Sequence, residues 1–392
     1  MRIAVSGIGV VSAIGTGVEE NLRNLRAEQS GVGRLTLFAS RHAVPVGEVK
    51  ASNSELKERL GIAPNTVVSR TTLLGMIAAG EALQDAAPEQ TLRIGLVSAT
   101  SVGGMDLTER FFGDFMCDPT RGRIAMAAQH DPVHSTARIA AHCGITGYTT
   151  TISTACSSAA NAIILAARLI DHGICDAVVA GGCDALSKFT LNGFLSLGIL
   201  DSSPCRPFDV SRTGLNLGEG AGYLVLQRTD TLTKEPYCCL TGYANANDAY
   251  HQTASSETGD GAFLAMSRAL TKAGVAPHEI GYINVHGTGT PNNDATEAAA
   301  MIRLFGREVP AFSSTKPFTG HTLAAAGGIE AVYSVLSVAK GVCYGNLNFR
   351  TPVEGTSLIP CTHFEAGADI QHVLTNSFGF GGNDTSLIFS KR

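Results

Sequence analysis

The chain has 392 residues, of which 44% are hydrophobic and 16% charged, and its formal net charge at pH 7 is -5. This length accommodates two ordinary domains or one large duplicated domain with a sizeable core. The negative charge argues against nucleic-acid binding through bulk electrostatics. Because no apolar run approaches the roughly 20 residues that span a bilayer, we expect no membrane span either. The 10 cysteines form no CxxC pair, which favours reduced thiols in a cytoplasmic protein and no metal site.

In chain order, short β-branched runs alternate with alanine- and leucine-rich segments, a pattern typical of a layered α/β protein. Buried strands are predicted at 2–10, 93–101, 176–182 and 221–228, and a helix that ends at a glycine is predicted at 161–173. The polar segment 229–237 contains a proline and is the weakest seam in the chain. We therefore predict two units, residues 1–232 and 233–392.

The second unit loosely repeats the first. In the first, a strand at 93–98 precedes "TISTACSSAANAIILAARLIDHG". In the second, a strand at 280–290 precedes "AFSSTKPFTGHTLAAAGGIEAVYSVLSVAKG". Each half carries a potentially reactive side chain, Cys156 or His321, from a small-residue turn into an alanine-rich helix. Two such halves, each a sheet with helices, predict a layered sandwich with pseudo-twofold symmetry.

Cys156 has two interpretations. A free cysteine is most often a small buried hydrophobe. However, Thr154, Ser157 and Ser158 crowd this one, and a helical pattern follows directly. A thiol at a helix N-terminus lies near unpaired N–H groups and the positive end of the dipole, which stabilise a thiolate and can receive the oxyanion of an attacked thioester. The local sequence leaves both interpretations open.

A second group lies in "NVHGTGTPNNDATEAAA", where His286 follows a predicted strand and enters a turn of glycine and threonine. A lone histidine there would by default form local hydrogen bonds. Thr288 and Thr290 could bind an extended polar ligand. Asp294 and Glu297 open the next helix, where capping and anchoring is the favoured role for their charge.

A third group contains Lys316 and His321 in a mostly uncharged stretch. Lys316 would need a partner if buried, and Glu330 follows His321 on the same predicted helix. Near the end of the chain, "SFGFGGNDTS" places Phe378 and Phe380 among glycines, which permit close backbone approach and mobility; a plain tight turn is the alternative.

One thiol, two turn histidines and one lysine form a coherent chemical set. A thiolate can take an acyl group, and two neutral histidines can donate hydrogen bonds to a developing enolate oxygen. The set predicts carbon–carbon bond formation on thioesters through a covalent acyl-cysteine, with no metal or redox cofactor.

The motifs "TACSSA", "VHGTGT", "KPFTGH" and "SFGFGG" occur in the order and approximate spacing found in the elongating β-ketoacyl–acyl carrier protein synthases. "CRPFDVSRTGLNLGEGAG" and "NDAYHQT" also resemble that family, so the likeness covers nearly the whole chain. The resemblance implies a thiolase fold: duplicated βαβ-type halves stacked as a five-layer αβαβα sandwich. It further implies a homodimer, or a heterodimer with a chain-length-factor-like homologue.

The resemblance also assigns roles to individual residues. Cys156 would be the nucleophile, His286 and His321 would bind the malonyl thioester carbonyl, and Lys316 would hold the electrostatic state of that region. The remaining implied roles are an oxyanion hole from the backbone N–H groups of Cys156 and Phe380, arm and acyl contacts from Thr288, Thr290, Phe378, Phe380 and Val102, and structural support from Glu330, Asp294 and Glu297. The expected partners are acyl carrier protein and malonyl and acyl thioesters. No resident cofactor is expected, because phosphopantetheine arrives on the carrier protein.

Two departures from the family pattern leave the acyl substrate open. The segment 114–133 lacks a "SPFFVP"-like stretch, and Val102 stands where many members have a larger aliphatic side chain. Fatty-acid elongation and a specialised polyene- or polyketide-like pathway are both compatible. Arg70, Arg121 and Arg123 are candidates for docking the acidic carrier protein.

Three other functions would require different residues. A coenzyme A-dependent thiolase would need a second cysteine in a C-terminal CxG turn, and Cys361 instead sits in "PCTHF". An initiating synthase would carry an asparagine where "KPFTGH" supplies His321. A non-catalytic chain-length-factor-like subunit would lack the thiol at position 156.

Overall fold

The computed structural model describes residues 3–353 and 356–392. Its main strands form two five-stranded sheets that meet edge to edge. The first runs in the order β1 (Ile3–Ser12), β8 (Gly220–Arg228), β7 (Ala177–Asp184), β5 (Ile94–Ala99), β6 (Thr149–Ile152). The second runs in the order β9 (Cys238–Asn247), β15 (Asn383–Ser390), β14 (His372–Gly379), β10 (Ile280–Asn284), β11 (Ala311–Ser313). A short antiparallel pairing of β1 with β9 joins them.

The two arrangements have the same topology. In each, the first strand pairs antiparallel with the last (β1 with β8, β9 with β15), and the last pairs antiparallel with its other neighbour (β7 or β14). The remaining two strands of each arrangement extend it in parallel. In the first, β5 pairs with β7 and β6 with β5; in the second, β10 pairs with β14 and β11 with β10. The predicted duplication is therefore present strand by strand.

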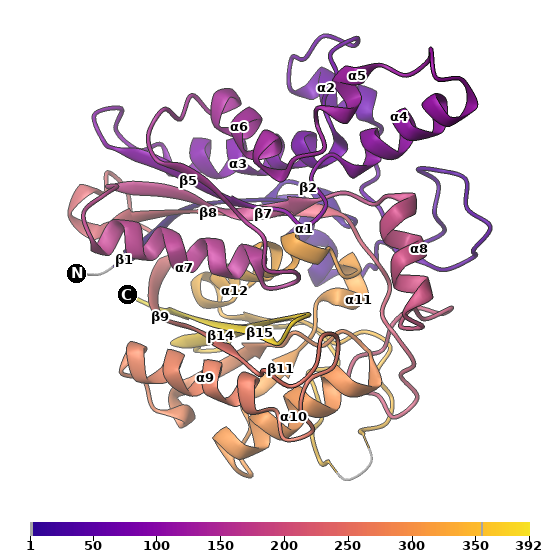
Figure 1. The fold of residues 1–392 in the computed structure, drawn as a ribbon. Coiled ribbons are helices and arrows are strands. Elements are labelled where there is room, and N and C mark those ends of the chain that lie inside the picture. Colours follow the sequence, from indigo (N-terminus) through magenta and orange to yellow (C-terminus); the bar gives the residue numbers. More distant parts are fainter. Residues whose placement is uncertain (1–2, 354–355) are drawn as a thin grey trace.

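Helices separate and cover the two sheets. These are α1 (Val18–Arg26), α2 (Asn53–Arg59), α3 (Arg70–Ala86), α4 (Met105–Cys117), α5 (Ile124–Ala127), α6 (Pro132–His142), α7 (Ser158–Asp171), α8 (Lys188–Ser196), α9 (Asp260–Ala273), α10 (Pro291–Phe305), α11 (Lys316–Thr319) and α12 (Ala326–Lys340). Figure 1 shows α3 and α6 above the first sheet, α7 and α12 between the sheets, and α9 and α10 below the second. The predicted five-layer sandwich is confirmed.

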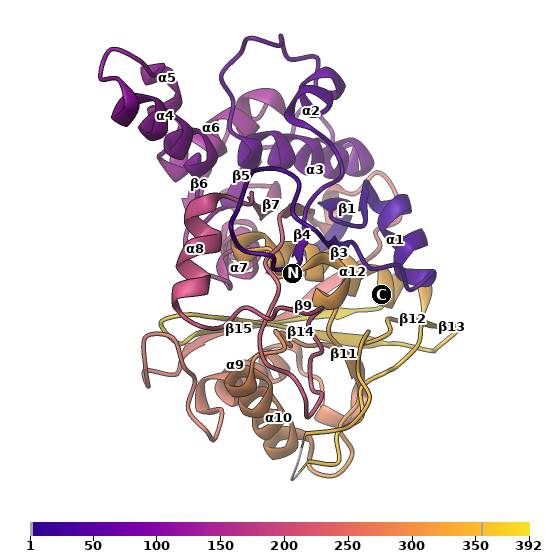
Figure 2. The same cartoon turned by 90° about the vertical axis from the view of Figure 1, so that its right-hand side faces the viewer.

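The minor elements lie in the connections. They are the strands β2 (Gly15–Thr16), β3 (Val32–Gly33), β4 (Val46–Gly47), β12 (Val342–Cys343) and β13 (Glu365–Ala366), and the 3-10 turns η1 (Thr229–Thr231), η2 (Pro277–Glu279) and η3 (Leu323–Ala325). The view in Figure 2 shows α8 beside the two stacked sheets and α4 and α5 projecting away from the rest.

The central layer explains the composition of its helices. The segment Leu323–Lys340, which includes α12, is long and apolar enough to cross a membrane by length and composition alone. However, 89% of it is buried inside the protein, between two sheets. A helix that is apolar on all sides is what this position requires.

Several predicted boundaries shift. The strand predicted at 280–290 ends at Asn284, because Gly287 and Gly289 have φ of +36° and +83° and turn the chain. The helix predicted from 161 begins at Ser158. The strands β9, β14 and β15 were not identified from sequence.

Candidate functional site

The thiol of Cys156 lies in a tight turn between β6 and α7. The residue before it, Ala155, has φ of +52°, a conformation that costs a side-chain-bearing residue energy and must be held by its surroundings. Ser158 Oγ supplies that support, since it accepts from the backbone N–H of Thr154 at 2.8 Å and donates to the carbonyl oxygen of Ala155 at 2.5 Å. The small residues around the thiol therefore fix the turn that presents it.

The electrostatics of the free thiol differ from the sequence-based expectation. Burial raises the pKa of Cys156 to about 12, while the positive charge of Lys316 and a hydrogen bond from the backbone N–H of Phe380 oppose the rise. The helix begins two residues later, with Ser157 at the N-cap position, so its dipole acts from a short distance. Any lowering by the helix end is opposed by desolvation, which is the largest influence on the pKa of this thiol.

The two histidines meet at right angles. His286 follows β10, His321 follows α11, and their ring centroids lie 5.4 Å apart with an interplanar angle of 86°. Nδ1 of His286 is 3.3 Å from Nζ of Lys316, and Nδ1 of His321 accepts from the backbone N–H of Leu323 at 3.3 Å. An ammonium and a backbone N–H can only donate, so each ring carries its hydrogen on Nε2.

Both imidazoles are held neutral. Burial, and next the positive charge of Lys316, lower the pKa of His286 and of His321 well below the ordinary value. The site therefore offers two uncharged Nε2–H donors from two different chain segments. Such a pair suits an oxygen that gains negative charge during a reaction.

Lys316 holds this arrangement from the interior. It is only 1% exposed, its Nζ donates to the carbonyl oxygen of His286 at 2.5 Å, and it forms an ion pair with the buried carboxylate of Glu330. Burial raises the pKa of Glu330 to about 7, and Lys316 opposes that rise. The ion pair connects α11 with α12 and keeps a positive charge next to His286.

Two buried carboxylates shape the turn after β10. Glu297 accepts from the backbone N–H groups of His286 and Gly287, both at 2.9 Å. Asp294 accepts from Gly289 at 3.2 Å and from Phe208 at 2.9 Å. Both carboxylates come from α10 and anchor the histidine turn to that helix.

A cavity of about 320 Å³ brings these groups together. Its lining includes the thiol, both histidines, both predicted threonines and both predicted phenylalanines: Cys156, His286, His321, Thr288, Thr290, Phe378 and Phe380. The ring of Phe194, on α8, stacks on that of Phe380 with centroids 6.0 Å apart, and residues 253–255 and 291–293 line the same space. Val102 lies outside this cavity, against an apolar cluster that contains Leu186 and Leu191.

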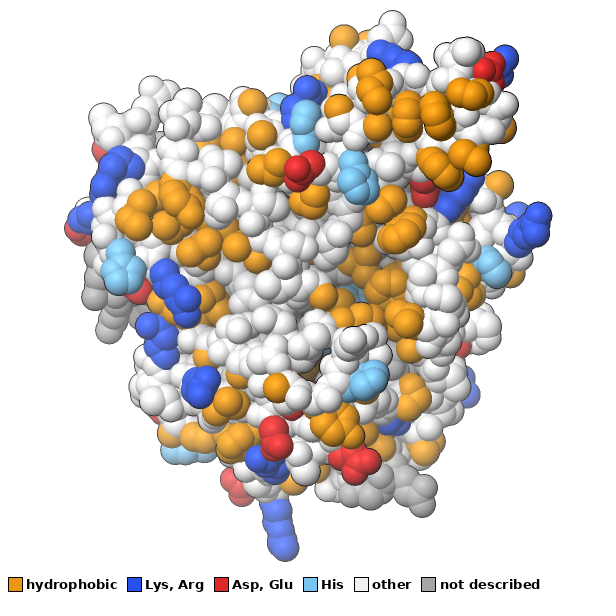
Figure 3. Space-filling view, viewed as in Figure 1, with side chains coloured by type: hydrophobic (Ala, Val, Ile, Leu, Met, Phe, Trp, Pro, Cys, Tyr) orange, Lys and Arg blue, Asp and Glu red, His pale blue; other side chains and the backbone are white. Residues whose placement is uncertain are grey.

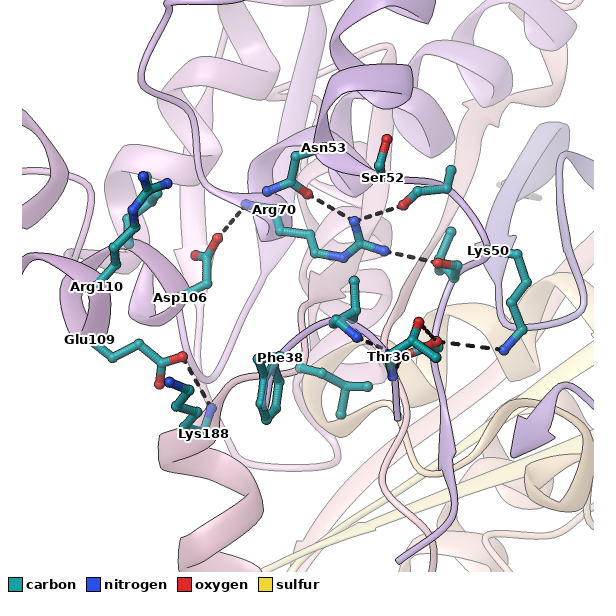
Figure 4. A pocket seen from close by; sticks show the side chains of 16 residues that line it. Thr36, Phe38, Lys50, Ser52, Asn53, Arg70, Asp106, Glu109, Arg110 and Lys188 are labelled. Atoms are coloured by element: carbon teal, nitrogen blue, oxygen red, sulfur yellow. Dashed lines mark hydrogen bonds and ion pairs between the residues drawn. The ribbon is translucent and has the colours of Figure 1, made fainter. Parts of the chain in front are cut away.

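A larger groove of about 740 Å³ lies near α2, α4 and the start of α8 (Figure 4). Arg70 does not present its charge there: it is 3% exposed and its guanidinium bonds Glu219, Asn53 and the carbonyl oxygens of Val49 and Ala51. The idea that Arg70 docks a partner is therefore wrong, since the residue is part of the interior.

Arg121 and Arg123 do lie on the surface. Arg121 forms an exposed ion pair of 3.4 Å with Asp118. These two arginines remain candidates for docking.

Two residues near the site were missed from sequence. Asp184, at the end of β7, accepts from Thr100 Oγ1 at 2.5 Å and from the backbone N–H of Ala324 at 2.8 Å, and burial raises its pKa to about 6. Its signal was an acidic residue at the end of an otherwise apolar strand. Phe194 gave no signal, because its role depends on the fold bringing α8 against the C-terminal loop.

Comparison with known proteins gives a consistent result over the whole chain. The family "Beta-ketoacyl synthase, N-terminal domain" matches residues 1–231 and "Beta-ketoacyl synthase, C-terminal domain" matches residues 237–350. The chain is similar to 3-oxoacyl-[acyl-carrier-protein] synthase 2 of Vibrio harveyi, at 33% identity over 100% of this chain and 98% of the relative.

Two solved structures share the fold along their length. One is the ishigamide ketosynthase/chain length factor, with a TM-score of 0.94 and 29% identity over 100% of this chain and 99% of that one. The other is the ketosynthase ApeO of Xenorhabdus doucetiae in complex with its chain length factor ApeC, with a TM-score of 0.86 and 31% identity over 100% of this chain and 98% of that one.

Proposed function

The chain belongs to the beta-ketoacyl synthase family, and we propose that it catalyses decarboxylative Claisen condensation of an acyl thioester with malonyl-acyl carrier protein. It is thus an acyltransferase that makes a 3-oxoacyl-acyl carrier protein. One observation carries the assignment of residues: two neutral histidines, with Nδ1 engaged and Nε2–H free, line the same cavity as a buried thiol.

In the first half-reaction, Cys156 Sγ attacks the carbonyl carbon of the acyl thioester. The backbone N–H of Phe380, which already points at the thiol, and the N–H of Cys156 receive the oxyanion. The bond from carbon to the carrier sulfur breaks, and the proton of the Cys156 thiol leaves with the released carrier thiol. Positive charge from Lys316 favours the thiolate that forms during attack.

In the second half-reaction, the first carrier protein has left, and malonyl-carrier protein inserts its phosphopantetheine arm into the same cavity. Nε2–H of His286 and of His321 donate to its thioester carbonyl oxygen, which gains negative charge as the carbon–carboxylate bond breaks and carbon dioxide leaves. The enolate carbon attacks the acyl-Cys156 carbonyl, and the resulting oxyanion collapses with the Cys156 sulfur as leaving group. A proton from water restores the thiol.

The threonines fit an arm site. Thr288 Oγ1 and Thr290 Oγ1 lie 2.9 Å apart on the cavity wall, where they can bind the amide groups of a phosphopantetheine arm. The arm comes with the carrier protein, so the reaction needs no cofactor resident in this chain. Soluble carrier proteins as substrates suit a cytoplasmic enzyme.

An exposed apolar surface supports a dimer. Phe112, Phe115 and Met116 on α4 and Ile124 on α5 are between 41% and 74% exposed, and Figure 3 shows hydrophobic side chains gathered on that projection. Strand β6 lies at the edge of the first sheet, with backbone groups available for pairing. We place a second subunit there, either an identical chain or a chain-length-factor-like homologue.

Both fatty-acid elongation and a specialised polyene- or polyketide-like pathway use this reaction. The similarity to two ketosynthases with chain length factors favours the specialised pathway. A non-catalytic subunit is the alternative function, and the thiol at position 156 together with the histidine pair argues against it.

The proposal is tested by acyl loading. The protein is incubated with acyl-acyl carrier proteins of increasing chain length, and adducts are identified by intact mass beside a Cys156→Ala variant. We expect one acyl group per chain, absent from Cys156→Ala. Loading of the alanine variant, or of neither protein by any chain length, would refute the assignment.

A further inference from the structure

A half-buried carboxamide, that of Asn383, links the two segments that carry the oxyanion donors. Cys156 lies before α7, whereas Phe380 lies in the loop between β14 and β15. Asn383 is the first residue of β15 and the cross-strand partner of Gly379, so it closes the loop that holds Phe380. Its side chain reaches across to the residue that follows Cys156.

Three donors converge on one oxygen of Asn383. Oδ1 accepts from Ser157 Oγ at 2.7 Å, from Asn161 Nδ2 at 2.8 Å and from Asn245 Nδ2 at 2.8 Å. Asn161 lies in α7 and Asn245 in β9, whereas Ser157 lies in the turn that presents Cys156. We call that turn, residues 154–157, the nucleophile turn. A carboxamide oxygen at this point therefore ties both halves of the duplicated fold together beside the thiol.

The network is continuous with the turn itself. Asn161 Nδ2 also donates to Thr154 Oγ1 at 2.9 Å, and Ser157 Oγ lies 2.8 Å from the carbonyl oxygen of Thr154. The backbone of the Phe380 loop packs on the same turn, since a Cβ at Gly379 would come within 2.8 Å of the Thr154 carbonyl oxygen. Shifting Asn383 would change the separation of the two N–H donors.

We propose that Asn383 is a positioning residue that sets the distance between the N–H groups of Cys156 and Phe380, and so controls acyl transfer to Cys156 but not malonyl decarboxylation. This inference rests on the proposed function. Decarboxylation depends on the two histidines, which are held by Lys316, Glu297 and the N–H of Leu323, and none of these contacts involves Asn383. The two half-reactions should thus respond differently.

The experiment compares the two half-reactions in matched variants. Acyl transfer from acyl-carrier protein to Cys156 is measured in single turnover for the wild type, Asn383→Ala, Ser157→Ala and Thr385→Val. Thr385 belongs to the same network through hydrogen bonds with Asn161 and Asn245, and among the described residues no hydrogen bond joins its side chain to residues 154–157, so Thr385→Val controls for general loss of packing. Carbon dioxide release from malonyl-carrier protein is measured in a Cys156→Gln background with and without Asn383→Ala.

We expect Asn383→Ala to slow acyl transfer by about tenfold or more, with a smaller loss in Ser157→Ala and less than about twofold in Thr385→Val. Carbon dioxide release should change by less than about twofold. An equal loss in both half-reactions, or a loss of acyl transfer no greater than in Thr385→Val, would overturn the proposal. Should Asn383→Ala fail to fold, Ser157→Ala decides by the same comparison. A wild type that neither loads nor decarboxylates would instead refute the proposed function.

Discussion

Nζ of Lys316 contacts His286 twice, at the carbonyl oxygen (2.5 Å) and at ring Nδ1 (3.3 Å). One ammonium thus fixes both the backbone and the tautomer of a histidine that lies on a different segment. Because the same ammonium is paired with a buried carboxylate, its charge is kept inside the protein.

Replacing Lys316 should lower both the free energy of unfolding and the rate of decarboxylation. Lys316→Met leaves Glu330 buried without its partner and should lower the free energy of unfolding by about 3 kcal/mol. Decarboxylation should fall by about 100-fold or more, since His286 loses the contact that sets its Nε2–H. The measurements are urea unfolding and carbon dioxide release from malonyl-carrier protein.

The matched control is Lys316→Met with Glu330→Gln, which removes both charges. This double variant should regain most of the stability but none of the decarboxylation. Recovery of activity along with stability would contradict the role given to the lysine.

The lowered pKa values of His286 and His321 predict a pH dependence of stability. Below the ordinary histidine value of 6.5, the unfolded chain binds protons that the folded imidazoles do not, so the two histidines make the free energy of unfolding fall as pH falls. Glu297 and Glu330, with pKa raised to about 7, act in the opposite direction over roughly pH 4.5 to 7.

The histidine contribution is isolated by comparison with a His286→Gln/His321→Gln variant. Between pH 7.5 and 5.5 the wild type should lose about 2–3 kcal/mol more than this variant, about 1.4 kcal/mol for each histidine. Equal losses measured by urea unfolding at the two pH values would show that the imidazoles are not held neutral.

Gly379 is predicted to tolerate no side chain. A Cβ there would lie 2.8 Å from the Thr154 carbonyl oxygen and 3.3 Å from the backbone nitrogen of Cys156, and backbone atoms cannot move away cheaply. Gly379→Ala should slow acyl loading of Cys156 by about tenfold or more. Gly193→Ala on α8 is the control, because a Cβ there would meet no described atom within 4 Å outside its chain neighbours and its own helix backbone. Similar loading rates in the two variants would count against this packing.

The stacked pair Phe194 and Phe380 should restrict the acyl group. Phe194→Ala enlarges the cavity beside the thiol and should shift loading toward longer chains, measured by competition between acyl-carrier proteins. Phe189→Ala is the control, since Phe189 is 63% exposed on the same helix and lies outside the cavity lining. An unchanged chain-length preference in Phe194→Ala would exclude this role.

Much of the architecture could be predicted from local patterns. The strand–turn–helix units around Cys156 and His321 have small residues at the turn and apolar periodicity after it, so both halves were recognisable from sequence. The C-terminal hairpin was not, because its glycine-rich loop resembles an ordinary turn and its strands are defined by pairing with β9 and β10.

The central residues of the site were predictable from sequence, but its electrostatics were not, and neither were Phe194, Asp184 or the place of Val102 outside the cavity. Residue types and spacing indicated the thiol, the histidines and the lysine. Burial could not be inferred from them: it raises the pKa of Cys156 where the helix end alone would lower it, and it makes Arg70 an interior residue. The Asn383 network joins residues more than 200 positions apart, and no local pattern marks such a contact.

The most direct measurement of the central claim is product analysis of a complete reaction. Wild-type protein is mixed with one acyl-carrier protein and with malonyl-carrier protein labelled at its free carboxyl carbon. We predict a 3-oxoacyl-carrier protein two carbons longer than the starting acyl chain, with one labelled carbon dioxide per product and neither from Cys156→Ala. Product that retains the label, or elongation by the alanine variant, would contradict decarboxylative condensation at Cys156.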